Sequence, residues 1–176
     1  MTNAPASAVI VRTRLPDGLE RRRRRFATDA DLGVPAHLTL LYPFVEPARL
    51  DTPVRRRIAA VAAHHDPFDY RLLGPARWPD VLYVAVEPVD PFVALQADLA
   101  SAFPDHPVYG EPAGFVYIPH VTVAEGPPIE DPTIGAGAAW SALPRPARAT
   151  AIEIIATDGG RWRLVWRVRL GGSGRR

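Results

Sequence analysis

Cysteine and lysine are both missing from the 176-residue chain. The lack of cysteine excludes a disulfide framework, a thiolate metal site and a thiolate nucleophile. The lack of lysine means that all 21 basic side chains are arginines. Two interpretations of this bias stay open, because it agrees both with G+C-rich codon usage and with bidentate recognition of phosphate, which arginine performs better than lysine.

Long hydrophobic runs are missing too. No apolar run approaches the roughly 18 residues that a membrane-spanning helix needs, and residues 1–14 lack the basic and then apolar segments of a signal peptide. The formal net charge of +2 is too small to indicate a nucleic-acid coat by itself. We therefore expect a cytoplasmic protein with no membrane partner.

Hydrophobic residues, by contrast, make up 47% of the chain, which is enough for a substantial core. The length suits one domain, and we expect this domain to cover residues 1–170, followed by a disordered tail at residues 171–176. We also expect a monomer with no obligatory protein partner.

Strands and helices are expected in a repeating order. Hydrophobic patterns predict strands at residues 8–12, 37–41, 68–73, 81–87, 115–125, 149–157 and 162–170, and helices at about 16–30, 51–65 and 91–103. Gly74-Pro75 predicts a turn, and residues 126–147 are expected to be mostly loop. In each half a strand leads to a helix and then to a strand with His-x-Thr. The order predicts a duplicated, bilobal α+β fold, with two small, mostly antiparallel sheets facing a central groove and helices on the outside.

The two His-x-Thr motifs carry the chemistry. They are HLTL at residues 37–40 and HVTV at residues 120–123. Alternation along a strand places His and Thr on one face with alpha carbons about 6.5 Å apart, so both side chains reach one phosphate. One such motif is expected roughly 0.08 times by chance when template matches are counted. A structural histidine is the alternative for either copy alone, but the pair favours a matched general acid and general base.

Four segments make the chain resemble the two-histidine (2H) phosphoesterase superfamily, in its bacterial 2′-5′ RNA ligase-like branch. They are HLTLLYPF, RWPDVLYVAVEP, FPDHPVYG and YIPHVTVAEG, and the resemblance runs from about Ala8 to Leu170. It implies a bilobed, pseudo-symmetric fold whose two motif strands line a central groove. It also implies hydrolysis or transfer at 2′,3′-cyclic phosphates or 2′-5′ linkages in RNA or nucleotides, with no metal and no cofactor.

The resemblance assigns roles to residues of this chain. The residues that match the catalytic pattern are His37, Thr39, His120 and Thr122. By family analogy alone, His120 is the general base toward water and His37 the general acid toward the leaving oxygen. One position departs from the pattern: relatives often have a basic residue just after the second motif, but here it is Glu125, whose charge would repel phosphate.

Aromatic residues flank both motifs. Tyr42 and Tyr117 are predicted to bind the substrate by stacking on a base. The alternative is that these tyrosines, like Phe44 and Phe115, belong to the core.

Other polar clusters receive no role. The five arginines at residues 21–25 spread around more than one helical turn, so they predict a solvated face. His64 and His65 are expected at a helix C-terminus, and His106 in a loop. No zinc-ligand spacing such as His-Glu-x-x-His is present.

Two classes of function remain. The first is an enzyme, a cyclic phosphodiesterase acting on RNA ends. The second is a non-catalytic module that binds RNA ends or nucleotides with the same fold, although binding alone would not need a paired acid and base. Ligation of RNA ends by the reverse reaction is a further alternative.

Overall fold

The computed structural model describes residues 4–110, 116–130 and 132–171. In these ranges the strands are β1 (Ala6–Arg12), β2 (His37–Leu41), β3 (Phe68–Trp78), β4 (Val81–Glu87), β5 (His120–Glu125), β6 (Arg145–Ala149), β7 (Ala151–Thr157) and β8 (Arg163–Arg169). The helices are α1 (Asp17–Phe26), α2 (Thr52–Ala63) and α3 (Asp90–Ala102), with short 3-10 helices η1 (Pro47–Arg49), η2 (Val108–Gly110), η3 (Pro127–Glu130) and η4 (Pro132–Gly135). None of the helices in the described ranges is long and apolar enough to cross a membrane.

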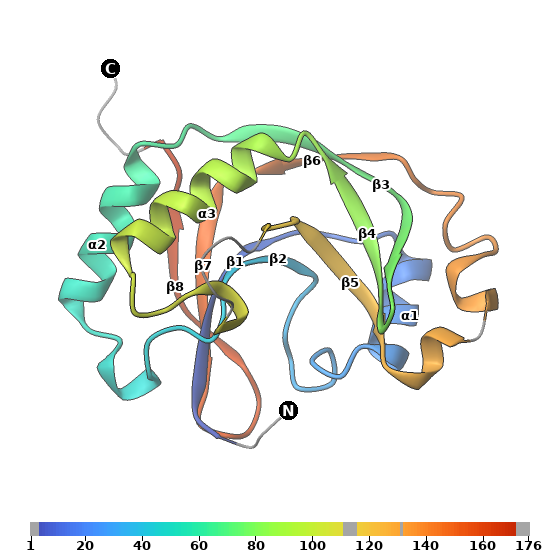
Figure 1. Ribbon diagram of the computed structural model, residues 1–176, viewed down its shortest axis with the longest axis horizontal. Helices are drawn as coiled ribbons and strands as arrows, with labels where there is room; N and C mark the ends of the chain where they lie inside the picture. Colours follow the sequence, from blue (N-terminus) through green and yellow to red (C-terminus); the bar gives the residue numbers. More distant parts are fainter. Residues whose placement is uncertain (1–3, 111–115, 131, 172–176) are drawn as a thin grey trace.

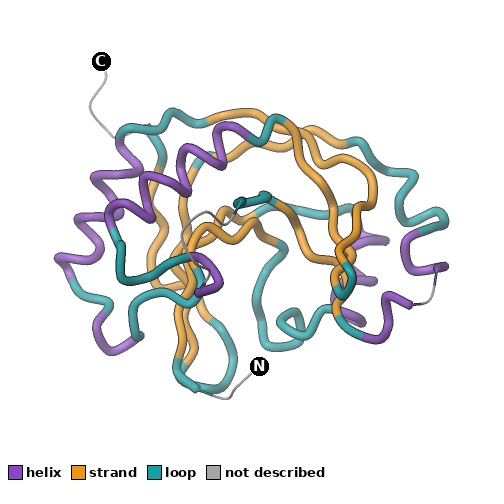
Figure 2. Tube along the Cα trace, viewed as in Figure 1, coloured by secondary structure: helices purple, strands orange, loops and turns teal. Residues whose placement is uncertain are grey.

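The strands form two antiparallel sheets, which gives the two lobes (Figures 1 and 2). Sheet A has the order β2-β1-β7-β8, and sheet B has the order β5-β4-β3-β6. The chain passes from sheet B to sheet A at Thr150, between β6 and β7. The predicted bilobal α+β fold is confirmed.

The two halves share the pairing register of their motif strands as well as the order of their elements. Both motif strands, β2 and β5, are edge strands that pair with the strand preceding the helix, β1 and β4. In each pair the register shifts at the residue after the threonine, so that Leu40 and Val123 have no partner opposite. Both of these residues are fully buried. This shared bulge presents Thr39 and Thr122 in the same way at the edge of each lobe.

The helices tie the lobes together. Helix α1 follows a strand of sheet A but packs on β5 of sheet B, whereas α3 follows a strand of sheet B but packs on β2 of sheet A and on α2 (Figure 1). Leu19 of α1 and Leu95 and Leu99 of α3 are fully buried in one cluster with residues of both sheets. Each such side chain contributes about 1.5–3 kcal/mol by leaving water. The edge strands β2 and β5 also contact each other, which brings the two motifs together.

The predicted turn at Gly74-Pro75 is wrong, because β3 continues to Trp78. The pairing of β3 with β4 shifts register between Leu72 and Pro75. Proline lacks the N–H that a regular ladder needs, and a bulge accommodates it without a lost hydrogen bond. Part of the expected loop at residues 126–147 is also strand, because β6 begins at Arg145 and forms the outer edge of sheet B.

Two other elements have boundaries that differ from those expected. Helix α1 ends at Phe26 instead of near Ala30, and the next residues form turns that direct the chain back toward β2. Regular pairing of β5 starts at His120, later than the predicted Phe115. Phe115 and residues 172–176 of the predicted tail lie outside the described residues.

Candidate active site

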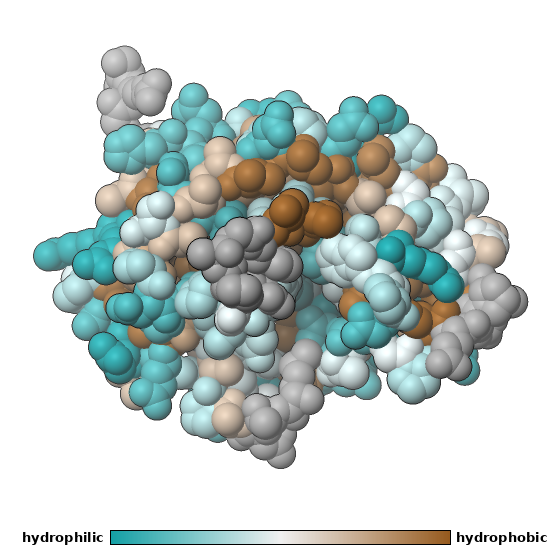
Figure 3. All heavy atoms as spheres, viewed as in Figure 1, coloured by the Kyte–Doolittle hydropathy of each residue, from teal (hydrophilic) through white to brown (hydrophobic). Residues whose placement is uncertain are grey.

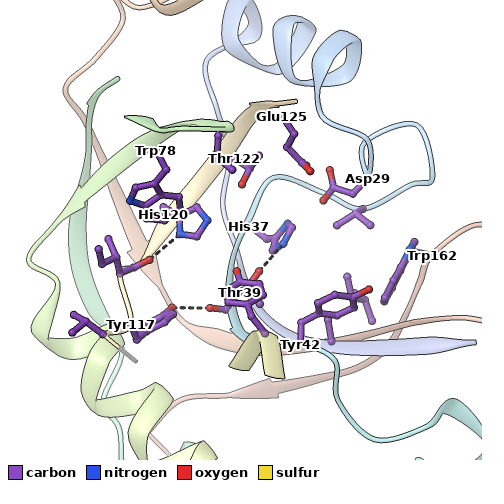
Figure 4. A pocket seen from close by; sticks show the side chains of 17 residues that line it. Asp29, His37, Thr39, Tyr42, Trp78, Tyr117, His120, Thr122, Glu125 and Trp162 are labelled. Carbon is purple, nitrogen blue, oxygen red and sulfur yellow. Dashed lines mark hydrogen bonds between the residues drawn. The ribbon is translucent and has the colours of Figure 1, made fainter. Parts of the chain in front are cut away.

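A pocket of about 560 Å³ lies where β2 and β5 meet, which is a size typical of ligand sites. Figure 4 shows the imidazole of His37, from β2, and that of His120, from β5, on facing sides of it. The structure brings all six of the predicted site residues into its lining, namely His37, Thr39, Tyr42, Tyr117, His120 and Thr122.

Both imidazoles are anchored through the same nitrogen. The Nδ1 atom of His37 lies 2.8 Å from the carbonyl oxygen of Pro35, and that of His120 lies 2.8 Å from the carbonyl oxygen of Ile118. A carbonyl only accepts a hydrogen bond, so Nδ1 carries the proton in both rings. Nε2 is therefore the atom of each ring that exchanges a proton in the pocket.

Aromatic rings hold His120 in place. Trp78 meets its ring edge-on with centroids 4.6 Å apart, and Tyr83 does so at 5.3 Å. Burial lowers the pKa of His120, the hydrogen bond to Ile118 raises it by less, and a positive charge on His37 lowers it further. His120 is therefore biased toward the neutral form, which accepts a proton.

His37 has a different electrostatic environment. Burial lowers its pKa, but the nearby Asp29 carboxylate raises it, as does the hydrogen bond to Pro35, while Arg23 lowers it. The Nε2 atom of His37 lies 3.1 Å from Oγ1 of Thr39. The carboxylate distinguishes His37 from His120 and favours holding a proton there.

Asp29 is fixed by a buried ion pair. Its Oδ1 lies 2.7 Å from Nη2 of Arg23, and Nη1 of the same arginine donates to the carbonyl oxygen of Val34 at 3.0 Å. Arg23 is only 1% exposed. The predicted solvated face at Arg21–Arg25 is therefore wrong for this residue, because the loop after α1 folds back and supplies acceptors that satisfy the buried guanidinium.

Tyr117 supports the first motif. It is 9% exposed, and its hydroxyl donates to the backbone oxygen of Thr39 at 2.7 Å. Burial raises the pKa of Tyr117, so the phenol stays protonated and remains a donor. The contact joins the segment before β5 to β2, so this tyrosine helps hold the two motif strands together.

Tyr109 is a pocket residue that the sequence reasoning did not single out. Burial raises the pKa of its phenol, whereas a hydrogen bond with the Thr39 side chain lowers it. Its backbone has a φ of 56°, which is uncommon for a residue with a side chain. The only local signal is the Tyr-Gly step after a proline, which is typical of a turn.

The other aromatic side chains divide between pocket and core. Tyr42 lines the pocket beside Trp162, with ring centroids 6.2 Å apart, and Trp162 was also missed. Phe44 packs edge-on against Phe103 at 4.9 Å and against His106 at 5.5 Å, so it is a core residue.

The rim of the pocket is apolar. Val116 and Ile118, in the segment that leads into β5, both line it and are 73% and 41% exposed. Figure 3 shows apolar surface over this segment. An exposed apolar rim suits a flat, uncharged part of a ligand such as a base.

The charged side chains in the pocket lining are acidic. They are Asp29 and Glu125, and the described lining residues include no arginine. Burial raises the pKa of Glu125, and the charge of Asp29 raises it further, although Thr28, which donates to its Oε2 at 3.4 Å, lowers it. Glu125, which stands where relatives often have a basic residue, thus places a carboxylate in the pocket.

Comparison with known proteins gives one family. The sequence model of the 2′-5′ RNA ligase superfamily matches residues 11–161. The sequence comparison with curated proteins gave no match.

Solved structures share the fold. TT0787 of Thermus thermophilus has a TM-score of 0.55 and 17% identity, over 96% of this chain and 100% of that chain. E. coli LigT complexed with 3′-AMP has a TM-score of 0.55 and 16% identity, over 95% of this chain and 98% of that chain. E. coli LigT complexed with NADP+ has a TM-score of 0.53 and 16% identity, over the same shares of the two chains.

Proposed function

The chain belongs to the 2′-5′ RNA ligase superfamily, and from that premise we propose that it is a phosphoesterase that opens 2′,3′-cyclic phosphates or 2′-5′ linkages in RNA or nucleotides. The proposed catalysts are the two histidines, acting as general acid and general base without a metal. The observation that carries the proposal is that His37 and His120 face one pocket, each with Nδ1 tied to a carbonyl and Nε2 left for proton transfer.

In the proposed hydrolysis of a cyclic phosphate, each histidine transfers one proton. A water oxygen attacks phosphorus while its proton passes to Nε2 of neutral His120. The bond from phosphorus to one ribose oxygen breaks, and that oxygen takes the proton from Nε2 of protonated His37. The pKa directions support this division of roles, because Asp29 favours the proton on His37 and a charged His37 disfavours a second proton on His120.

The two threonines donate hydrogen bonds to the non-bridging phosphate oxygens, on which negative charge rises in the transition state. Before the substrate binds, the Nε2–H of protonated His37 donates to the Thr39 oxygen 3.1 Å away. The leaving oxygen replaces Thr39 as the acceptor of this N–H during the reaction, and the hydroxyl hydrogen of Thr39 points at phosphate. Thr122 occupies the equivalent place beside His120 on β5.

The base and ribose would lie toward the aromatic side of the pocket. LigT, which shares the fold, has been solved with 3′-AMP and with NADP+, so this fold accommodates nucleotides in that protein. We assign the base to the surface formed by Tyr42 and Trp162, which lines the same pocket as the apolar rim at Val116 and Ile118. Base stacking on aromatic side chains contributes roughly 1–3 kcal/mol.

The proposal is tested with a panel of 2′,3′-cyclic nucleotides and a 2′-5′-linked dinucleotide, with products read by phosphorus NMR. Turnover to a single monoester isomer, undiminished after dialysis against EDTA, is expected. Binding without turnover would instead assign the chain to the alternative, a non-catalytic module for RNA ends or nucleotides. Loss of activity with EDTA and its return with zinc would contradict the two-histidine mechanism. Ligation would show as formation of 2′-5′ linkages from cyclic-phosphate and 5′-hydroxyl ends.

A further inference from the structure

A second hollow, of about 460 Å³, lies where the two sheets meet at β6 and β7. We call it the arginine groove, because five arginines line it: Arg12, Arg14, Arg145, Arg148 and Arg167. Arg12 is in β1, Arg14 lies two residues after it, Arg145 and Arg148 are in β6, and Arg167 is in β8. The tertiary fold therefore brings them together, and they are not a run of neighbours in the sequence.

The charge of the groove is unbalanced. Glu153 is the one acidic residue among its described lining residues, against five arginines, although the whole chain has a formal net charge of only +2. Its carboxylate lies 3.9 Å from Arg167 and is almost fully buried. Like charges gathered in this way repel one another, and a bound polyanion relieves that repulsion.

Three of the arginines are available to a ligand. Arg12, Arg14 and Arg145 are exposed, and within the described part of the chain their side chains form no hydrogen bond or ion pair. Arg148 is paired with Asp69 at 2.8 Å on the surface, where such a pair contributes little. The groove therefore presents several guanidinium donors that no acceptor among the described residues uses.

The groove is next to the catalytic pocket in the sheet register. Arg12 is the Cα partner of His37 across β1 and β2, so the two residues project from the same face of sheet A about 5 Å apart. Glu153 pairs with Ile10, and Arg167 pairs with Glu153, which places Arg167 on this face as well. Arg167 is two strands away from Ile10, which is two residues from Arg12 on β1, so at the usual strand spacing and rise Arg167 lies about 12 Å from Arg12. A chain leaving the pocket past His37 would thus run into the groove.

We propose that the arginine groove binds the backbone phosphates of the RNA strand whose end reacts in the two-histidine pocket. The pocket, with two carboxylates and no arginine among its described lining residues, offers the reacting phosphate only its histidines and threonines, so further charge-based binding of the strand must come from outside it. The adjoining groove holds the phosphates that precede it in the strand. This proposal rests on the proposed function and makes an oligonucleotide, in preference to a mononucleotide, the substrate.

The test compares two substrates in two double variants. Arg14→Gln/Arg145→Gln removes two unpaired groove charges, and Arg55→Gln/Arg56→Gln removes two exposed, unpaired charges from α2, outside both hollows. The substrates are a 2′,3′-cyclic mononucleotide and a short single-stranded RNA ending in a 2′,3′-cyclic phosphate. Binding of the same RNA is also followed by fluorescence anisotropy at several salt concentrations.

The groove variant is expected to lose about tenfold or more in RNA affinity, and the slope of log affinity against log salt should fall by about 1.4 for two lost phosphate contacts. Its kcat/KM should fall more for the RNA than for the mononucleotide, and the α2 variant should change neither. Equal RNA affinity and salt slope in wild type and groove variant would overturn the groove while leaving the proposed function standing. No turnover of either substrate by wild type, with RNA affinity still lost in the groove variant, would overturn the proposed function and support the groove.

Discussion

His37 and His120 are held in the same way, each by a 2.8 Å hydrogen bond between Nδ1 and the carbonyl oxygen two residues earlier in the chain. Their neighbours differ. The Asp29 carboxylate raises the pKa of His37, whereas His120 lies against the rings of Trp78 and Tyr83 and its pKa is lowered by the charge of His37. The same hydrogen-bond geometry in two electrostatic environments would allow the two histidines to take the opposite proton-transfer roles that we propose.

The pH dependence follows from the shifts of both histidines. Activity needs one protonated and one neutral ring, and burial lowers the pKa of each below the usual value of about 6.5. The proton is therefore lost at a lower pH than from free imidazole, and the bell-shaped profile of kcat/KM should have its optimum on the acidic side of that value. An anionic phosphate between the rings raises both pKa values, so the optimum of kcat should lie at higher pH. Coincident optima near pH 8 would contradict this account.

The two threonines should respond differently to removal of the hydroxyl. Thr39→Val and Thr122→Val each remove one donor to phosphate, which should cost about 1–3 kcal/mol, or roughly 5- to 150-fold in kcat/KM. Thr39 also bonds His37, so only its variant should shift the pH profile. Steady-state kinetics across pH checks this. Two variants with full activity would show that neither hydroxyl touches the phosphate.

Glu125 should oppose binding of an anionic substrate. Glu125→Gln should lower KM by about tenfold at neutral pH, because it removes a negative charge from the pocket. Its raised pKa means that the carboxyl group becomes neutral as pH falls through that value, so the advantage of glutamine should disappear in acid. Glu46→Gln, at an exposed site outside the pocket, is the control. A KM that rises in Glu125→Gln would mean that this carboxylate binds the substrate.

The ion pair beneath His37 should stabilise the fold. Arg23→Ala leaves the Asp29 carboxylate and a carbonyl oxygen without their donor, and breaking a buried pair in this way costs about 3–5 kcal/mol. Arg24→Ala, which removes an exposed neighbour, should change the free energy of unfolding by less than about 0.5 kcal/mol. Urea denaturation measures both, and equal stability of the two variants would contradict the role given to Arg23.

The sequence predicts the repeat and the motif residues because both depend on local patterns. A strand alternates its faces, so His-x-Thr places both side chains together wherever the strand lies. Arg23 shows the limit of such reasoning, because its burial depends on a loop that folds back from six residues away. Gly74-Pro75 reads locally as a turn, but the neighbouring strand and a bulge keep it in β3. The Tyr-Gly step at Tyr109 indicates a turn, but only the tertiary fold places that turn at the pocket.

The arginine groove bears on the arginine bias of the chain. Composition alone does not separate codon usage from phosphate recognition. Five arginines, from β1, the segment after it, β6 and β8, line the arginine groove, and Arg12 lies opposite His37 in the sheet. This placement favours phosphate recognition for these five residues.

The most direct test is the rate at which wild type, His37→Ala, His120→Ala and the double variant open a 2′,3′-cyclic nucleotide, with His64→Ala, an exposed histidine on the surface, as control. Each single variant should lose roughly 10²–10⁴ in kcat, as expected for a lost acid or base. The double variant should lose little more than either one, because residues that act as a unit are not additive. Turnover that survives in either single variant at the wild-type rate would contradict two-histidine catalysis.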